Sequence, residues 1–308
     1  MTPERFLRLV NDITIWKKGS QRAPHKPLLL LLMLGRSFHG EARLIPFTEA
    51  ETRFGELWRR FGPPRRGLVQ YPFRYLENDG IWEIPRVSEL PSWDTDYLRL
   101  TDLRKHDVEG GFTREVSELL ESDPELALRA ARLLLAGHFP ISLHDEIFEA
   151  VGLSHDLWVP GLPRLREPGK KQRMVGYRRP RRLVFRKEVL EAYDERCAIC
   201  DFDLRINDEL LGLEAAHIQW HSHNGPDNVF NGLALCLLHH RALDRGAVGL
   251  EAKGKGYRVL VSGHVRGSKP SESLLSDSSG QLIRPPQSRL HVPHRTFVDW
   301  HRAQVFRN

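Results

Sequence analysis

Cysteine and histidine occur as two closely spaced pairs in the C-terminal half of the chain. Cys197 and Cys200 form a C-x2-C pair, and Cys236 and His239 form a C-x2-H pair. Two such pairs can place four soft or borderline ligands around one tetrahedral ion, which suits zinc. A closed set of four protein ligands leaves no position for a substrate, so we expect a structural zinc. The alternative is that these side chains are small, buried and apolar.

Three more polar residues are interleaved with these pairs. His217 follows the first pair, Asn231 precedes the second, and His240 comes directly after His239. On a helix, His240 points about 100° away from His239 and so faces a different pocket. A neutral imidazole can accept a proton from water near pH 7, which suits His217 as a general base for hydrolysis. A divalent cation (Mg²⁺, Mn²⁺ or a similar ion) would stabilise the charge on a phosphate under attack.

This order of residues resembles the HNH nuclease motif of the ββα-metal fold. The resemblance implies that His217 is the general base, that His240 binds the catalytic cation, and that Asn231 binds it or holds the loop presenting His217. Many HNH proteins carry a metal-binding residue immediately before the base, where this chain has Ala216. Glu214 is a candidate replacement, although it could equally orient the zinc module or cap the strand.

The remaining polar residues near the motif have plainer expected roles. His221 and His223 lie in a turn-rich segment and are expected to be exposed loop residues, with contact to a DNA phosphate as the alternative. Arg241 is a candidate phosphate contact. Asp244 is expected to make a structural ion pair or a polar contact at the end of its helix.

Two N-terminal segments place apolar rings beside cationic groups. His25 and Lys26 stand between two prolines, and Tyr71, Pro72 and Arg74 lie in the segment QYPFRYL. Phosphate oxygens require N–H and O–H donors. A sulfur atom is larger, softer and less hydrated, and would suit ring carbons with a cation nearby. The alternative is that Tyr71, Pro72 and Phe73 are strand residues that face the core.

Together with the C-terminal motif, these segments resemble the McrA-like sulfur-binding-domain HNH endonucleases. Those proteins are type IV restriction enzymes that recognise phosphorothioate-modified DNA. The resemblance implies that Tyr71 and Pro72 help to form a sulfur pocket, and that His25 and Lys26 hold the DNA backbone or a base edge. We add Arg74 because it is adjacent to them.

The predicted fold class is α+β, with a mixed N-terminal DNA-reading domain and a zinc-stabilised HNH domain. We expect a sulfur-binding domain at 1–159, a basic linker at 160–182, and an HNH domain with a C-terminal extension at 183–308. Within these, the sequence predicts helices at 28–34 and 47–61, a hairpin over 67–84, and a helix at 231–246 that ends at Gly246.

The whole-chain properties favour a nucleic-acid partner. A net charge of +6 and a pI of about 9.3 suit double-stranded DNA. No apolar run is long enough to span a membrane, and the charged N-terminus is unlike a secretory signal, so we expect a cytoplasmic protein. One HNH site normally cuts one strand, so we expect either a homodimer or sequential nicking of the two strands. The alternatives are an HNH enzyme that reads methylated or other modified bases, and a zinc-containing DNA-binding regulator without cleavage.

Overall fold

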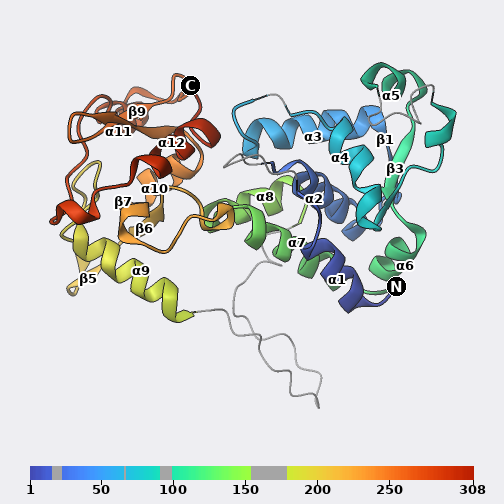
Figure 1. Cartoon of the computed structure of the whole chain (residues 1–308), viewed down its shortest axis with the longest axis horizontal. Helices are drawn as coiled ribbons and strands as arrows, with labels where there is room; N and C mark the ends of the chain where they lie inside the picture. The colour runs from blue at the N-terminus through green and yellow to red at the C-terminus, as the bar shows by residue number, and fades with distance from the viewer. Residues whose placement is uncertain (16–22, 66, 91–98, 154–178) are drawn as a thin grey trace, which may run out of the picture. The chain divides into compact units, whose positions relative to one another are not determined.

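The computed structural model divides the chain into two compact units, Met1–Trp158 and Val159–Asn308 (Figure 1). It describes residues 1–15, 23–65, 67–90, 99–153 and 179–308. Helices and short strands are present in both units, so the predicted mixed fold is confirmed. Among the helices of these described residues, none has the length and apolarity that a membrane crossing requires.

The N-terminal unit is built around helix α2 (His25–Phe38). Residues 28–34 of this helix are all buried, which confirms the helix expected there. Pro27 lies in its first turn, where the missing N–H of proline costs no hydrogen bond. Helix α2 packs against α7 (Pro124–His138), α3 (Phe47–Phe61), α4 (Gln70–Tyr75) and α6 (Arg114–Ser122) (Figure 1).

A small antiparallel sheet with strand order β1-β3-β2 completes this unit. The sheet consists of β1 (Leu44–Pro46), β3 (Glu109–Phe112) and β2 (Trp82–Glu83). The other helical elements are α1 (Pro3–Asn11), η1 (Glu77–Asp79), η2 (Val87–Glu89), α5 (Leu100–His106), η3 (Ile141–Leu143) and α8 (His144–Ala150).

The hairpin expected over 67–84 is wrong. The first half of the segment is helix α4, and the second half is the single-turn helix η1 followed by strand β2. The buried residues Val69, Phe73 and Leu76 follow one another at intervals of four and three, the spacing of one helical face. The chain turns between η1 and β2 at Gly80, whose φ of 71° lies in the left-handed region. Trp82 then pairs with Phe112 of β3.

The C-terminal unit contains a ββα arrangement. Strands β6 (Leu213–His217) and β7 (Gly232–Cys236) pair antiparallel, and helix α10 (Leu237–Asp244) follows directly. The surrounding elements are α9 (Arg179–Ala192), β4 (Arg205–Ile206), β5 (Glu209–Leu210), η5 (His221–His223), η6 (Val229–Asn231), β8 (Val248–Lys253), β9 (Gly256–Val261), α11 (Lys269–Ser276), η7 (Arg289–His291) and α12 (Arg295–Gln304).

The helix expected over 231–246 is therefore wrong in its first half. Residues 232–236 are all buried, and such a short apolar run is compatible with either a buried strand or a buried helix. Pairing with β6 makes it a strand. The predicted end is confirmed, because Gly246 follows α10 with a φ of +72°. A Cβ at this glycine would lie 2.0 Å from the carbonyl oxygen of Val305, so the position favours glycine.

The expected basic linker at 160–182 lies largely outside the described residues. Its last residues, 179–182, belong to helix α9, which begins before the expected domain start at residue 183. Helix α9 packs against both strands of the ββα arrangement.

Candidate active site and zinc centre

The four expected zinc ligands lie together. Their ligand atoms all lie within 4.8 Å of one another. The Nδ1 atom of His239 lies 3.2 Å from the Cys236 sulfur and 3.7 Å from the Cys197 sulfur, and the sulfurs of Cys200 and Cys236 are 3.9 Å apart. Tetrahedral zinc with bonds of about 2.3 Å places its sulfur ligands about 3.8 Å apart. These residues therefore fit a tetrahedral ion.

The electrostatics of the three thiols also suit a cation. Hydrogen bonds from its thiol neighbours lower the pKa of Cys236 to about 3. Hydrogen bonds with Cys197 and Cys236, together with burial, raise the pKa of Cys200. A divalent ion removes this difference, since it binds cysteine as the thiolate.

His217 occupies the last position of strand β6, opposite Gly232 of β7. Its ring stacks on the buried ring of Phe185 from helix α9, with centroids 4.0 Å apart and an interplanar angle of 14°. A Cβ at Gly232 would lie 2.4 Å from Val189 and 3.2 Å from Phe185, so glycine allows α9 to approach the strand. The side chain of His217 remains 20% exposed, and the ring can meet a substrate.

The loop between β6 and β7 contributes a carboxylate to His217. Asp227 Oδ1 lies 2.9 Å from His217 Nε2. Burial lowers the pKa of His217, and this effect outweighs the hydrogen bond and the charge of Asp227, which raise it. The charge of Asp244 also raises the pKa of His217, whereas the nearby His221 lowers it. The balance favours a neutral imidazole at pH 7.

Asn231 is fully buried and holds this loop. Its Oδ1 accepts a hydrogen bond from the Gln219 N–H at 2.9 Å, and its Nδ2 donates to the carbonyl oxygens of Gln219 and Pro226, each at 3.0 Å. All the amide's contacts are with the backbone. The two expected roles of Asn231 were to bind the cation or to hold the loop. These contacts match the second role.

His240 lies between two carboxylates. Its Nδ1 is 2.7 Å from Glu214 Oε2, and its Nε2 is 3.3 Å from Asp244 Oδ2. Burial lowers the pKa of His240, but the two acids outweigh it and raise the pKa to about 10. Ala216, directly before His217, is fully buried and offers no ligand atom. Glu214 instead reaches His240 from the same strand.

Three other residues near the motif lie as follows. His221 is exposed, with its ring centroid 6.0 Å from that of His217. His223 packs between the rings of Trp220 and Trp300, at 5.7 and 5.6 Å, so it is not a free loop residue. Arg241 is exposed on helix α10.

Two N-terminal candidates are engaged in internal contacts. Lys26 Nζ lies 2.5 Å from Asp79 Oδ2, with side chains only 11% and 4% exposed. The ring of His25 stacks on Trp58, with centroids 4.2 Å apart. The role of both residues in holding DNA stays a prediction, and the structure adds that Lys26 is half of a buried ion pair.

The other three candidates lie on helix α4. Tyr71 is exposed, Pro72 is buried, and Arg74 forms an ion pair with Glu77. Their neighbour Phe73 is fully buried and packs edge-on against Phe47 and Trp82. The alternative of core-facing residues therefore holds for Pro72 and Phe73, whereas Tyr71 presents its ring to solvent.

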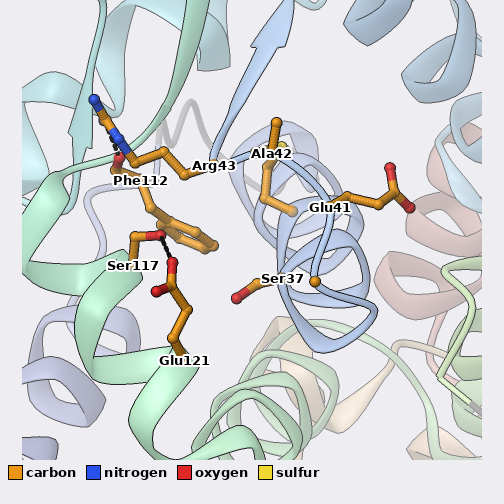
Figure 2. A pocket seen from close by; sticks show the side chains of 9 residues that line it. Ser37, Glu41, Ala42, Arg43, Phe112, Ser117 and Glu121 are labelled. Carbon is orange, nitrogen blue, oxygen red and sulfur yellow. Dashed lines mark hydrogen bonds between the residues drawn. The ribbon is translucent and has the colours of Figure 1, made fainter.

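The N-terminal unit also contains a small cavity, shown in Figure 2. Its volume is about 80 Å³, and it is lined by residues of α2, the following loop, β3 and α6, including Arg43, Phe112 and Glu121. Arg43 donates a 2.9 Å hydrogen bond to the carbonyl oxygen of Phe112, and Ser117 donates one to Glu121. None of the five predicted DNA contacts lines this cavity.

A ββα unit with a Cys₃His cluster and a His–Asn–His set is the architecture of a metal-dependent HNH nuclease. Residues 197–251 match the HNH_2 family of HNH endonucleases. Residues 3–156, half of the chain, match the ScoMcrA-like DNA sulfur-binding domain, and the chain belongs to this family. The predicted family and the prediction of an endonuclease are confirmed.

Similar solved structures include the sulfur-binding domain of ScoMcrA complexed with phosphorothioated DNA, which is 30% identical over 49% of this chain and 97% of that chain, with a TM-score of 0.44. The type IV phosphorothioation-dependent restriction endonuclease ScoMcrA is 30% identical over 49% of this chain and 33% of that chain (TM-score 0.43). The sulfur-binding domain of SprMcrA, also complexed with phosphorothioated DNA, is 24% identical over 50% of this chain and 95% of that chain (TM-score 0.44). None of the curated proteins matches the chain.

Sequence reasoning missed two residues of the site, Asp227 and Phe185. Asp227 lies in a turn segment, GPDN, where an aspartate is ordinarily explained by the turn itself. Phe185 lies next to the basic segment, and nothing in its surroundings indicates that it packs on a histidine. The segment between β6 and β7 is 14 residues long (218–231), and no sequence signal in it places Asp227 beside His217.

Proposed function

We propose that this protein is a restriction endonuclease that binds double-stranded DNA at phosphorothioate linkages and hydrolyses phosphodiester bonds near them. The observation that carries the proposal is the presence, in one chain, of a DNA sulfur-binding domain and an HNH domain with a complete His–Asn–His set. A DNA linkage in which sulfur replaces a phosphate oxygen is a phosphorothioate. A DNA sulfur-binding domain therefore implies this mark.

His217 is the proposed general base. The environments of the two histidines move their pKa values in opposite directions, downward at His217 and upward at His240. Such divergence is the usual sign of distinct acid–base roles. A neutral, partly exposed His217 can take the proton of an attacking water, whereas both ring nitrogens of His240 are engaged by carboxylates.

HNH nucleases depend on a metal, and we propose that His240 binds the catalytic cation, Mg²⁺ or Mn²⁺. Nε2 of His240 and Oδ2 of Asp244, 3.3 Å apart, can share one divalent ion. Glu214 at Nδ1 would then orient the ring, as carboxylates do for metal-binding histidines. Two carboxylates around one imidazole leave negative charge that a cation would neutralise. The bound cation would stabilise negative charge on the phosphate.

We propose zinc as the ion of the Cys₃His cluster, with a structural role. The cluster offers three sulfurs and one imidazole nitrogen, the donor set that zinc prefers. Because all four ligands come from the protein, the site has no open position for water or substrate.

At the sulfur-binding end, Tyr71 is the strongest of the proposed contacts, because its ring is 42% exposed on α4. Pro72 would support it from within the core. His25, Lys26 and Arg74 stay proposed DNA contacts, although Lys26 and Arg74 already pair with Asp79 and Glu77.

The test uses one duplex sequence in three forms: phosphorothioate-modified, base-methylated and unmodified. Binding and cleavage by the full chain are measured on each form with Mg²⁺ or Mn²⁺. Tight binding and cutting of the sulfur-modified duplex alone supports the proposal. Equal affinity for modified and unmodified DNA contradicts it, preference for the methylated duplex points to a base reader, and binding without cutting in either metal points to a regulator.

A further inference from the structure

The loop between β6 and β7 brings a carboxylate to the proposed general base. Asp227 Oδ1 and His217 Nε2 are 2.9 Å apart, and both side chains are about one-fifth exposed. An ionised carboxylate can only accept hydrogen bonds, so the shared proton belongs to Nε2. The other ring nitrogen, Nδ1, then carries the lone pair. Among the described residues, no hydrogen-bond partner of Nδ1 is found.

The ring plane and the loop are both fixed around this contact. Phe185 covers one face of the His217 ring at 4.0 Å. On the other side of the contact, Asn231 holds the carbonyl oxygen of Pro226, the residue directly before Asp227. A Cβ at Gly225 would lie 1.8 Å from the Gln219 carbonyl oxygen and 2.9 Å from Asn231 Nδ2, so the loop closes tightly only with glycine there.

We propose that Asp227 is a positioning residue for catalysis: it holds His217 as the Nε2–H tautomer, so that Nδ1 is the nitrogen that takes the proton from water. Asn231 acts one step further away, since it fixes the backbone that presents Asp227. This inference rests on the proposed nuclease function and adds to it the identity of the basic nitrogen and the residue that selects it.

The charged and titratable groups facing His217 are Asp227 from the loop, His221 from η5 and Asp244 from α10, with Phe185 of α9 as the apolar face. Of the two acids, Asp227 forms the hydrogen bond and has the larger effect. Removing its charge lowers the pKa of His217 further. The acid limb of the activity profile should therefore move to lower pH in an Asp227→Asn variant.

The first test is kinetic and uses the full chain on sulfur-modified DNA. In Asp227→Asn, the new amide can donate to Nε2 and so favours the wrong tautomer. We expect kcat to fall by about 100-fold or more, because the same change beneath a triad histidine costs about 10⁴-fold. DNA affinity should be unchanged. The matched control is Asp208→Asn, in an exposed turn with a φ of 64° that asparagine tolerates.

The second test reads the tautomer directly in the wild-type protein. ¹⁵N chemical shifts of histidine-labelled full chain, with His217 assigned by its loss in His217→Ala, should show a protonated Nε2 and an unprotonated Nδ1 above the pKa. A protonated Nδ1 in the wild type overturns the proposal, even if the variant cannot be folded. Wild-type kcat with an unshifted acid limb in Asp227→Asn also overturns it, while leaving the nuclease function intact. An active His217→Ala enzyme would contradict the assignment of His217 as the base, whereas a wild type that does not cut sulfur-modified DNA would contradict the proposed function.

Discussion

Two histidines of the active site differ in their electrostatic surroundings, although both are largely buried. His217 has one carboxylate on one ring nitrogen, and burial dominates its pKa. His240 has a carboxylate beside each ring nitrogen, and these two acids raise its pKa more than burial lowers it. At pH 7 the first ring is therefore neutral and the second is protonated until a cation displaces its proton. A proton acceptor and a cation ligand can thus coexist in one small site.

The role of His217 leads to a prediction for pH dependence. A general base works when neutral, so activity should rise with pH as His217 loses its proton and then reach a plateau. Because burial lowers the pKa of His217, this acid limb should lie below the ordinary histidine value of about 6.5. His217→Ala should reduce kcat by roughly 10²- to 10⁴-fold while leaving DNA affinity intact. The measurements are a pH–rate profile on sulfur-modified DNA and a binding titration.

Loss of DNA binding in His217→Ala would assign the residue to substrate contact and contradict a role as base. His221→Ala is the neighbouring control, since that ring is exposed and its charge only lowers the pKa of His217. In this control we expect wild-type kcat on the plateau, with the acid limb moved to higher pH or left in place.

The buried pair of Lys26 and Asp79 gives a prediction for stability. Removing one partner leaves the other charged and buried, which typically costs about 3–5 kcal/mol. Asp79→Asn should therefore lower the free energy of unfolding of the N-terminal unit by about that amount. Denaturant unfolding followed by tryptophan fluorescence measures the change, because Trp58 and Trp82 are in this unit.

The double variant Lys26→Met, Asp79→Leu separates stability from DNA binding. It replaces the pair with apolar side chains of similar size and should recover much of the stability. If its affinity for sulfur-modified DNA is also unchanged, Lys26 is a structural residue and not a DNA contact. A single Asp79→Asn variant as stable as the wild type would contradict the buried ion pair.

Residue types and spacing predicted much of the candidate site. The four zinc ligands lie together because each pair spans one tight turn, so local spacing fixes half of the geometry. His217 and His240 lie on the expected strand and helix, whereas Asn231, expected at the start of that helix, lies in the loop at the end of η6. Asp227 and Phe185 could not be predicted, because their contacts with His217 depend on how the loop closes and on where helix α9 packs.

At the scale of elements, helices with a clear apolar face were predicted and short segments were not. The residues of α3 form a buried stripe at helical spacing, whereas α2 is buried along its whole middle and its start is marked instead by Pro27 in the first turn. By contrast, residues 232–236 form a uniformly apolar run, and pairing with β6 made them a strand. The aromatic rings of residues 70–75 favour a strand, but the spacing of the buried residues Val69, Phe73 and Leu76 is that of a helix.

The zinc cluster links the segment that follows helix α9 to the junction of β7 and α10, in addition to the packing of α9 on the two strands. Cys197 and Cys200 follow helix α9, whereas Cys236 and His239 lie at the junction of β7 and α10. Cys197→Ser should therefore remove the metal and unfold the C-terminal unit, because a structural zinc is worth about 10–16 kcal/mol in small domains. Metal analysis of the purified full chain should give one zinc per wild-type molecule and none in the variant.

Limited proteolysis of the same samples localises the effect. Cleavage should appear within residues 179–308 of Cys197→Ser, while the N-terminal unit stays resistant, because each unit has its own core. The exposed Cys200 provides a second variant, Cys200→Ser. A metal-free, fully active Cys197→Ser protein would contradict the structural zinc.

At the scale of the whole molecule, one chain carries one His–Asn–His set among its described residues and faces a substrate with two strands. A nuclease with a single site can cut a duplex by two routes. One molecule can nick the two strands in succession, or two molecules can act together, each on one strand. We expect the second route, because a restriction function requires both strands to be broken before either nick is repaired. The expected homodimer then forms on the DNA.

The two routes differ in how cutting depends on protein concentration. On a plasmid with one phosphorothioate site, cooperation by two molecules predicts that linear product forms with little nicked intermediate, at a rate that rises with the square of the concentration below saturation. Mixing wild type with excess His217→Ala should then trap nicked circles, since each mixed pair holds one working base. If a single molecule makes both cuts, nicked circles precede linear DNA, the rate is first order in protein, and the inactive variant only competes for the site. That outcome would contradict the homodimer while leaving the chemistry at His217 in place.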